Sequence, residues 1–223
     1  MSSKLQPVHQ QMLIDSGISP KITEARGCFS ADAIAVATLG FKGDQCRSGL
    51  VFPNYGVDGQ FRAYELRADE PRIRNGRPVK YDRVVDAGNY LDVHPFMADR
   101  VRSANETIVI TEGSKKVDAL ATQGVAALGL KGIWGWRGKN KFGANGVIAD
   151  FEEVAIRDNK FIILFDSDIK TNTSIRDSAL RLKELLLSKR AASAVIKLLP
   201  YAGEQKRGVD DWITEIVRDK KYE

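Results

Sequence analysis

Two short stretches of the sequence place carboxylates directly after apolar runs. In "ETIVITEGSKK" (residues 106–116) the run ends at Glu112, and in "FIILFDSDIKTN" (residues 161–172) it ends at Asp166 and Asp168. If both runs are strands of one parallel sheet, their carboxyl ends meet at the edge where such sheets bind ligands. Three carboxylates there repel one another unless a cation lies among them, and hard oxygen ligands select Mg²⁺ or Mn²⁺. The pattern therefore predicts a divalent-metal site with the three acids as its catalytic centre.

Charged residues near these stretches have a structural alternative. An acid after a strand is also common as a helix cap or an ion-pair partner. Lys115 and Lys116, at the start of the helix expected after Glu112, could contact a phosphate or be solvated. In "KRGVDDWI" Asp210 is a candidate further metal ligand, and a helix cap is the alternative for Asp210 and Asp211.

From residue 105 onward, strand-like and helix-like segments alternate. The strand-like segments are 108–111, 125–130, 160–168 and 193–200, and the clearest helical ones are 114–124 and 174–190. Such alternation predicts an α/β fold with a parallel sheet and helices on both of its faces.

The part of the chain before residue 104 shows a different pattern of expected helices and strands. Residues 7–47 contain short helical pieces, and residues 49–69 form two strand-like runs around the turn signal Val57-Asp58-Gly59, which indicates a hairpin. We therefore predict a smaller mixed α+β subdomain over residues 1–103 and a second domain over residues 104–223.

The composition is that of a soluble globular protein, with 43% hydrophobic and 28% charged residues in a chain of 223. No apolar run approaches the roughly 18 residues of a membrane span, and the first residues do not resemble a secretory signal. We therefore expect a cytoplasmic protein without a membrane partner. Cys28 and Cys46 have no companion at zinc-ligand spacing, which argues against a structural zinc site.

Two segments concentrate basic residues together with aromatic ones. Residues 62–83 contain seven Lys or Arg against four acids, with Tyr64 and Tyr81 among them. Residues 131–143 contain four basic residues, no acid, and the rings of Trp134, Trp136 and Phe142. Cations with stackable rings are typical of grooves for single-stranded nucleic acid, and the alternative is a solvated charged face over core aromatics.

The stretches "ITEGSKKVDAL" and "ILFDSD" together resemble the Toprim domain. This metal-binding module is shared by bacterial-type primases, type IA and type II topoisomerases and certain nucleases, and its Glu and Asp-x-Asp hallmark matches Glu112, Asp166 and Asp168. The longer pattern, which adds Asn172, a long helix, "KLLP" and "GVDDW", is similar to Toprim-like domains of replication proteins from plasmids, phages and integrated elements.

The resemblance extends upstream to the smaller subdomain of primase catalytic cores. "GLVFPNYGVDGQFRAYELR" and "GRPVKY" are similar to its basic strand and its Pro-Lys-Tyr segment, with Arg67, Lys80 and Tyr81 at matching places. The segment here has one extra residue, Val79, between Pro78 and Lys80. The candidate nucleic-acid or nucleotide contacts are Arg67, Lys80, Tyr81, Lys115, Lys116, Arg137, Lys139, Lys141, Lys170 and Asn172.

The resemblance implies a metal-dependent, primase-like nucleotidyl transferase. Its cofactor would be Mg²⁺ or Mn²⁺, and its substrates a single-stranded DNA template and nucleoside triphosphates. Primases of this kind usually add a zinc module and a helicase contact, neither of which we expect in this sequence. Three explanations are open: a helicase or template-recognition partner supplies them, the sequence is a catalytic fragment, or the protein initiates differently. The alternatives are a Toprim nuclease, a non-catalytic nucleic-acid-binding module, and a haloacid-dehalogenase-type phosphatase suggested by "DSDIKT", in which the Thr is displaced by one position.

Overall fold

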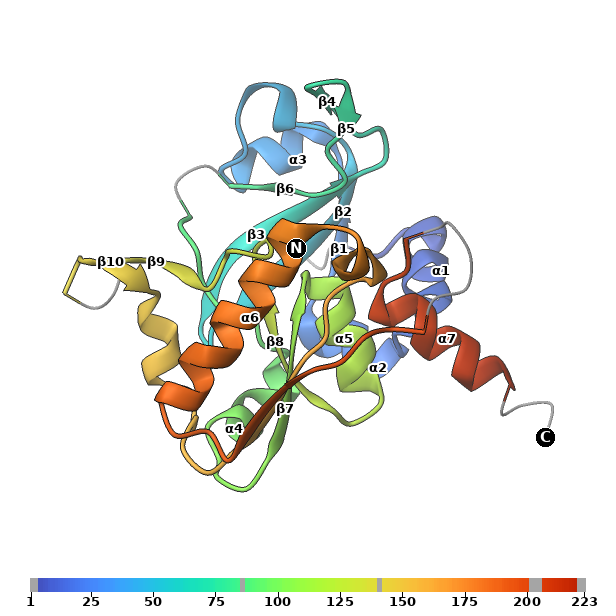
Figure 1. Cartoon of the computed structure of the whole chain (residues 1–223). Coiled ribbons are helices and arrows are strands. Elements are labelled where there is room, and N and C mark those ends of the chain that lie inside the picture. The colour runs from blue at the N-terminus through green and yellow to red at the C-terminus, as the bar shows by residue number, and fades with distance from the viewer. Residues whose placement is uncertain (1–3, 85–86, 140–141, 201–205, 220–223) are drawn as a thin grey trace.

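The computed structural model of the chain describes residues 4–84, 87–139, 142–200 and 206–219. It contains two four-stranded sheets, one antiparallel and one parallel, with helices packed around them (Figure 1). The antiparallel sheet comes from the first part of the chain and lies in the upper half of Figure 1.

The antiparallel sheet has the strand order β1-β2-β3-β6. Its strands are β1 (Phe29–Ala31), β2 (Gly49–Tyr55), β3 (Phe61–Ala68) and β6 (Asp82–Arg83). β2 and β3 form the predicted hairpin, which turns at Asp58 and Gly59, where Gly59 takes a positive φ of 76°. A separate two-stranded ribbon joins β4 (Ile73–Arg74) to β5 (Arg77–Pro78).

The parallel sheet has the strand order β12-β11-β7-β8. Its strands are β7 (Thr107–Glu112), β8 (Ala126–Leu130), β11 (Lys160–Ile163) and β12 (Ser193–Ile196). An antiparallel pair, β9 (Arg137–Lys139) and β10 (Asn145–Val147), projects from the connection between β8 and β11.

The helices fill the connections and cover the parallel sheet. They are α1 (Pro7–Asp15), α2 (Pro20–Arg26), α3 (Ala33–Thr38), α4 (Ala98–Val101), α5 (Ser114–Thr122), α6 (Thr173–Ser188) and α7 (Val209–Asp219). Four 3₁₀ turns are η1 (Gly43–Gln45), η2 (Pro95–Met97), η3 (Ala149–Glu152) and η4 (Ser167–Lys170). α5 packs on β7 and β8, whereas α6 packs on β11 and β12. None of the described helices combines the length and apolarity that a membrane crossing requires.

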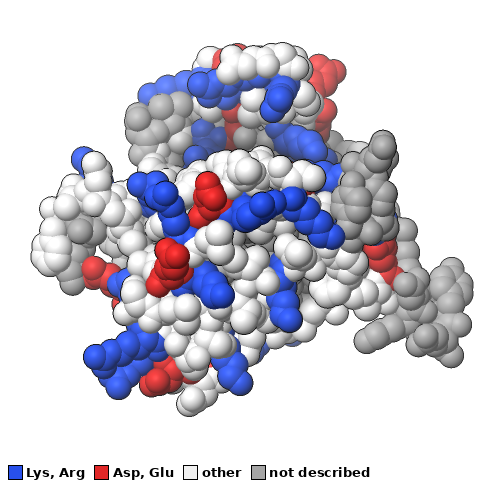
Figure 2. Space-filling view, in the orientation of Figure 1, with Lys and Arg blue, Asp and Glu red and all other residues white. Residues whose placement is uncertain are grey.

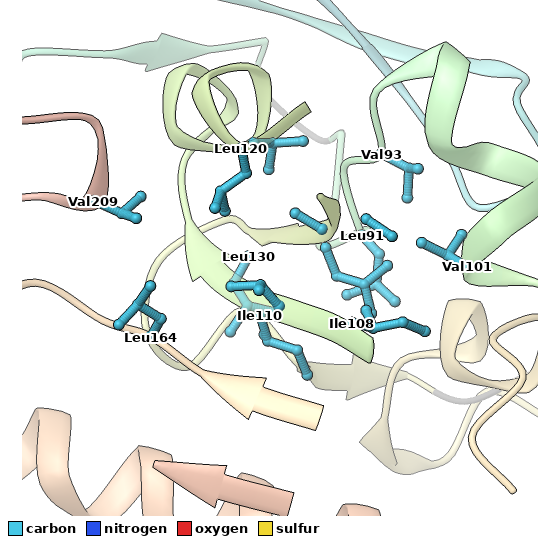
Figure 3. Packing of buried hydrophobic residues seen from close by; sticks show 14 of the residues in the cluster. Leu91, Val93, Val101, Ile108, Ile110, Leu120, Leu130, Leu164 and Val209 are labelled. Carbon is cyan, nitrogen blue, oxygen red and sulfur yellow. The ribbon is translucent and has the colours of Figure 1, made fainter. Parts of the chain in front are cut away.

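The predicted α/β class, with a parallel sheet covered on both faces, is confirmed. Ile108, Val109 and Ile110 of β7 are all at most 5% exposed although neighbouring side chains point to opposite faces of a strand. Figure 3 shows Ile108 and Ile110 packed with Leu91, Leu130 and other apolar side chains around this strand.

The main core continues across the boundary predicted near residue 104. Leu50 and Phe52 of β2 belong to the same buried cluster as the strands of the parallel sheet. Val51, which points to the opposite face of β2, instead joins a smaller cluster with Val36 of α3 and Leu66 of β3. The antiparallel sheet therefore packs one face on the second half of the chain, and the division into two domains stays a prediction.

A cluster of buried charged residues joins the parts of the chain before and after residue 104. Arg26, at the end of α2, contacts Asp92 (Nη1 to Oδ1, 2.9 Å) and Asp118 of α5 (Nη2 to Oδ1, 2.6 Å), and all three side chains are 0% exposed. Arg26 also donates to the carbonyl oxygen of Pro53 in β2 at 3.1 Å. Burial raises the pKa of Asp118 to about 7, even with Arg26 beside it. One guanidinium thus neutralises buried groups from both halves.

We predict that Arg26→Met destabilises the protein by about 3–5 kcal/mol, because removing one partner leaves buried carboxylates unpaired. Urea unfolding followed by circular dichroism measures the loss. The matched control is Arg102→Met, which removes an arginine that is 43% exposed and pairs with the 93% exposed Asp99, and which should cost about 0–1 kcal/mol. Equal losses in the two variants would contradict the role given to Arg26.

Candidate functional site

The carboxyl ends of β7 and β11 lie side by side. The two strands pair in parallel, with Ile110 opposite Ile163, so Glu112 at the end of β7 lies next to the segment that follows β11. Asp166 and Asp168 occupy that segment, at the start of η4. A cavity of about 450 Å³ opens at this edge. It is lined by Arg67, Lys80, Tyr81, Glu112, Gly113, Ser114, Lys115, Lys116, Asp166, Lys206, Gly208, Asp210 and Asp211.

The turn after Glu112 explains why acids and lysines share this cavity. Gly113 has a positive φ of 92°, a conformation that other residues adopt at a steric cost. It lets the chain pass directly from β7 into α5, whose first turn carries Lys115 and Lys116. The strand end and the helix start therefore contribute opposite charges to one place.

Lysines neutralise most of the carboxylates at the site. Lys116 Nζ lies 2.6 Å from Asp166 Oδ1, and Lys115 Nζ lies 2.9 Å from Asp210 Oδ2. Lys206 Nζ bridges the Asp-x-Asp pair, at 3.1 Å from Asp166 Oδ2 and 2.8 Å from Asp168 Oδ2. Both Asp166 and Asp210 are buried, so these contacts offset charges that water cannot reach freely.

Glu112 differs from Asp166, Asp168 and Asp210 because, within the described part of the chain, it has no ion-pair partner at contact distance. Burial raises its pKa, and the nearby charges of Asp166 and Asp168 act in the same direction. Lys116 and Lys206 oppose that shift without cancelling it. The site therefore favours the protonated form of Glu112 more than water does.

The donor set fits a hard divalent cation. Asp166 and Asp168 already hold a positive charge between them, and Asp168 Oδ1 is buried without a hydrogen-bond partner among the described residues. Carboxylate oxygens are the ligands that Mg²⁺ and Mn²⁺ prefer. Within the described ranges, no three Asp, Glu, His or Cys side chains are already arranged to coordinate a metal ion. Ammonium groups lie among the acids instead. The metal site therefore stays a prediction that the chemistry of the donors supports.

The opposite wall of the cavity comes from the antiparallel sheet and the segment after it. Arg67 of β3 donates from Nη1 to Tyr81 Oη at 3.1 Å, and its guanidinium lies 5.5 Å from the Tyr81 ring centroid. Lys80 is exposed at the same wall. The structure thus brings five of the predicted nucleic-acid contacts to the acids, namely Arg67, Lys80, Tyr81, Lys115 and Lys116.

The remaining predicted contacts that the structure describes are not among the residues that line this cavity. Arg137 and Lys139 are exposed on β9, and Lys170 is exposed at the end of η4. Asn172 caps α6, since its Oδ1 accepts from the backbone N–H of Ser174 at 3.0 Å. Lys141 lies outside the described residues.

The Trp-containing segment supports a structural use of its aromatic residues. Trp136 is buried and donates from Nε1 to Ser178 Oγ of α6 at 3.0 Å. The Arg137 guanidinium lies 5.4 Å from the ring centroid of Trp134 and 5.9 Å from that of Trp136. The Trp136 hydrogen bond attaches the connection after β8 to α6, and the Arg137 contacts lie within that connection.

Two further acids, Asp210 and Asp211, follow the Asp-x-Asp pair in the chain and also line the cavity. Asp210 faces the cavity through its contact with Lys115, whereas Asp211 Oδ2 accepts from the backbone N–H of Gly208 at 2.9 Å at the start of α7. Asp211 therefore caps α7 while it also lines the cavity, and a metal-ligand role for Asp210 stays a prediction.

Sequence reasoning missed two lysines that organise the site. The sequence around Lys206 does not indicate its contact with the acids, because those acids lie about forty positions upstream. Lys131 begins the segment 131–143, for which a nucleic-acid groove and a solvated charged face are both open, but its side chain is 1% exposed and contacts Glu65 Oε2 at 3.1 Å. It also donates to Ser114 Oγ and Asn54 Oδ1, each at 2.8 Å. This network buries the charge of Lys131.

Comparison with known proteins gives the chain a family. A family profile described as "Domain of unknown function (DUF3854)" matches residues 97–220, which is more than half of the chain. The chain belongs to this family. An uncharacterized protein of Picosynechococcus sp. (strain ATCC 27264 / PCC 7002 / PR-6), SYNPCC7002_B0001, is 35% identical over 116 residues, covering 48% of the DUF3854 chain and 11% of that protein. The DUF3854 chain thus spans about a tenth of that relative.

Solved structures similar to the DUF3854 chain are catalytic cores of bacterial primases. The Aquifex aeolicus primase structure, with zinc-binding and RNA polymerase domains, has a TM-score of 0.64 at 15% identity and is matched over 97% of this chain and 55% of its own. The RNA polymerase domain of Mycobacterium tuberculosis primase DnaG has a TM-score of 0.61 at 15% identity, over 95% and 74%. A DnaG primase catalytic domain bound to single-stranded DNA has a TM-score of 0.60 at 18% identity, over 94% and 71%. At these identities the likeness shows the fold, which is that of primase catalytic cores.

We predict that Glu112→Gln stabilises the metal-free protein at neutral pH. Because the folded state raises the pKa of Glu112, folding is penalised at a pH where the unfolded chain is ionised, and the neutral amide removes that penalty. The gain should shrink to nothing as the pH falls below the ordinary range of a glutamate, where both states are protonated. Melting temperatures of the two proteins in chelator across this pH range measure the difference, and a gain that persists in acid would contradict the assignment.

Proposed function

We propose that this chain is a metal-dependent, primase-like nucleotidyl transferase that synthesises primers on single-stranded DNA. The observation that carries the proposal is that one cavity joins the acids of the parallel sheet to a basic wall from the antiparallel sheet. The primase-core fold and a similar DnaG domain bound to single-stranded DNA support it. In this proposal residues 104–223 are a Toprim domain, residues 1–103 are its smaller partner subdomain, and the setting is replication of a plasmid, phage or other mobile element.

Asp166 and Asp168 would hold Mg²⁺ or Mn²⁺, with Glu112 and Asp210 as further ligands. A divalent cation bound there would neutralise a triphosphate and stabilise the leaving pyrophosphate. Glu112 has a second use, because a carboxylate whose pKa is raised is suited to take the proton of the attacking 3′-hydroxyl.

The basic wall would bind the phosphates of template and nucleotide. Arg67 and Lys80 lie across the cavity from the acids, and Lys115 is held at its floor by Asp210. On the face that Figure 2 shows, Lys and Arg are interspersed with Asp and Glu. Binding would therefore depend on the few cations of the cavity rather than on a broad basic surface.

A nuclease would use the same carboxylates to activate water in place of a sugar hydroxyl. Incubation of the protein with an end-labelled template, Mn²⁺ and nucleoside triphosphates that carry a second label separates the two reactions on one gel, since synthesis incorporates labelled nucleotides into new strands and hydrolysis shortens the template. New labelled strands support the proposal, and a shortened template replaces it with the nuclease. Template binding with neither reaction would favour a non-catalytic module, and a helicase or template-recognition partner would then be tested by addition to the assay.

We predict that Asp166→Asn and Asp168→Asn each lower primer synthesis by at least about a hundredfold, because each removes charge that the proposed cation needs. The control is Asp177→Asn, the same change on the exposed surface of α6, which should keep full activity. Circular dichroism checks that all three variants fold. Undiminished synthesis by the Asp166 and Asp168 variants would refute the catalytic assignment.

We also predict that Arg67→Gln and Lys80→Gln weaken binding of single-stranded DNA and each lower the salt dependence of the affinity by about one released counterion. Fluorescence anisotropy at several salt concentrations measures both quantities. Lys189→Gln is the matched control, because Lys189 follows the C-terminal end of α6, at the opposite end of the sheet from the acids. An unchanged salt slope in the Arg67 and Lys80 variants would place the template elsewhere.

A further inference from the structure

Lys206 occupies the position between the two carboxylates of the Asp-x-Asp pair. Its ammonium lies 3.1 Å from Asp166 Oδ2 and 2.8 Å from Asp168 Oδ2. Two carboxylates this close repel each other strongly in a partly buried site, and a positive charge between them removes the repulsion. Lys206 thus supplies the charge that the donors of this site require.

The backbone next to Lys206 is fixed independently of that ammonium. Ser167, the residue between the two acids, donates its backbone N–H to the carbonyl oxygen of Arg207 at 2.9 Å. The backbone N–H of Arg207 in turn donates to Ser167 Oγ at 2.9 Å. This reciprocal pair holds the start of the Lys206 side chain beside the acids whether or not the ammonium contacts them.

The side chain of Lys206 is half exposed to solvent, unlike the acids that it contacts. It is 53% exposed, whereas the acids it contacts are 10% and 29% exposed and the neighbouring Lys116 is 17% exposed. Lys206 therefore reaches the acids from the solvent side, and its departure opens no cavity in the core. The ammonium of Lys116, by contrast, is held within the wall of the site.

We propose that Lys206 is a built-in counter-ion that occupies the cation position in the metal-free protein and gives way when a divalent cation binds, so that it sets the affinity for the metal. The inference rests on the metal-dependent function proposed above. Once displaced, the ammonium stays at the cavity that also contains Arg67 and Lys80, where the phosphates of a substrate are its natural partners.

Titration calorimetry with Mn²⁺ alone tests the proposal on the full chain, without template or nucleotide. Lys206→Gln should bind Mn²⁺ about three- to tenfold more tightly than the unmodified protein, because the ion no longer displaces a half-exposed ion pair. Lys206→Arg keeps the competing charge and should stay within about twofold. Lys80→Gln removes the same charge from the same cavity without touching the acids, so its effect should be smaller than that of Lys206→Gln.

A second measurement needs no substitution. Acetylation of lysines by a water-soluble reagent, read by mass spectrometry, should modify Lys206 faster when the protein is saturated with Mn²⁺ than in chelator. The rate at Lys189, far from the site, serves as the internal standard. Equal Lys206 rates in the two conditions would contradict displacement.

Two results overturn the proposal: Mn²⁺ affinity that is unchanged or weaker in Lys206→Gln, and no Mn²⁺ binding by either protein. Its failure is separable from failure of the proposed function. If Lys206→Gln binds Mn²⁺ more tightly but the protein makes no primer, the counter-ion role stands and the nucleotidyl transferase assignment falls.

Discussion

Two buried cations, Arg26 and Lys131, hold the antiparallel sheet against the parallel one. Arg26 joins Asp92 and Asp118 at the back of α5, while Lys131 joins Glu65 of β3 to Ser114, the first residue of α5. A buried charge without its partner costs folding free energy. Arrangements of the two sheets in which Arg26 or Lys131 loses a partner are therefore less stable. Because α5 takes part in both clusters, the position of its first turn is fixed from both sides.

The cavity is a consequence of that arrangement. Its acids stand at the ends of β7 and β11, its basic wall stands on β3 and the segment after it, and α5 provides Lys115 and Lys116 between them. Among the described lining residues, five are basic and four are acidic, so the formal charges of the lining nearly cancel.

The sequence predicts the parts of this site that depend on local pattern. Glu112 and Asp166 follow apolar strand runs, and parallel pairing brings strand ends together, so their meeting at one edge follows from pattern alone. Lys206 and Lys131 could not be found in this way, because their roles depend on partners distant in sequence. Asn172 illustrates the reverse case, in which a polar residue expected to contact nucleotide caps α6. The β9–β10 hairpin was also not anticipated, since Gly- and Trp-rich segments read as loops.

α5 and α7 pack against each other beside Gly208, which has no Cβ atom. A Cβ at position 208 would collide with Asp210 Oδ1 and would lie 2.7 Å from Lys116 Cε. The bare backbone at 208 therefore leaves room for two of the charged side chains that line the cavity. A larger residue there would first displace those side chains, and with them the ion pairs of Lys116 with Asp166 and of Lys115 with Asp210.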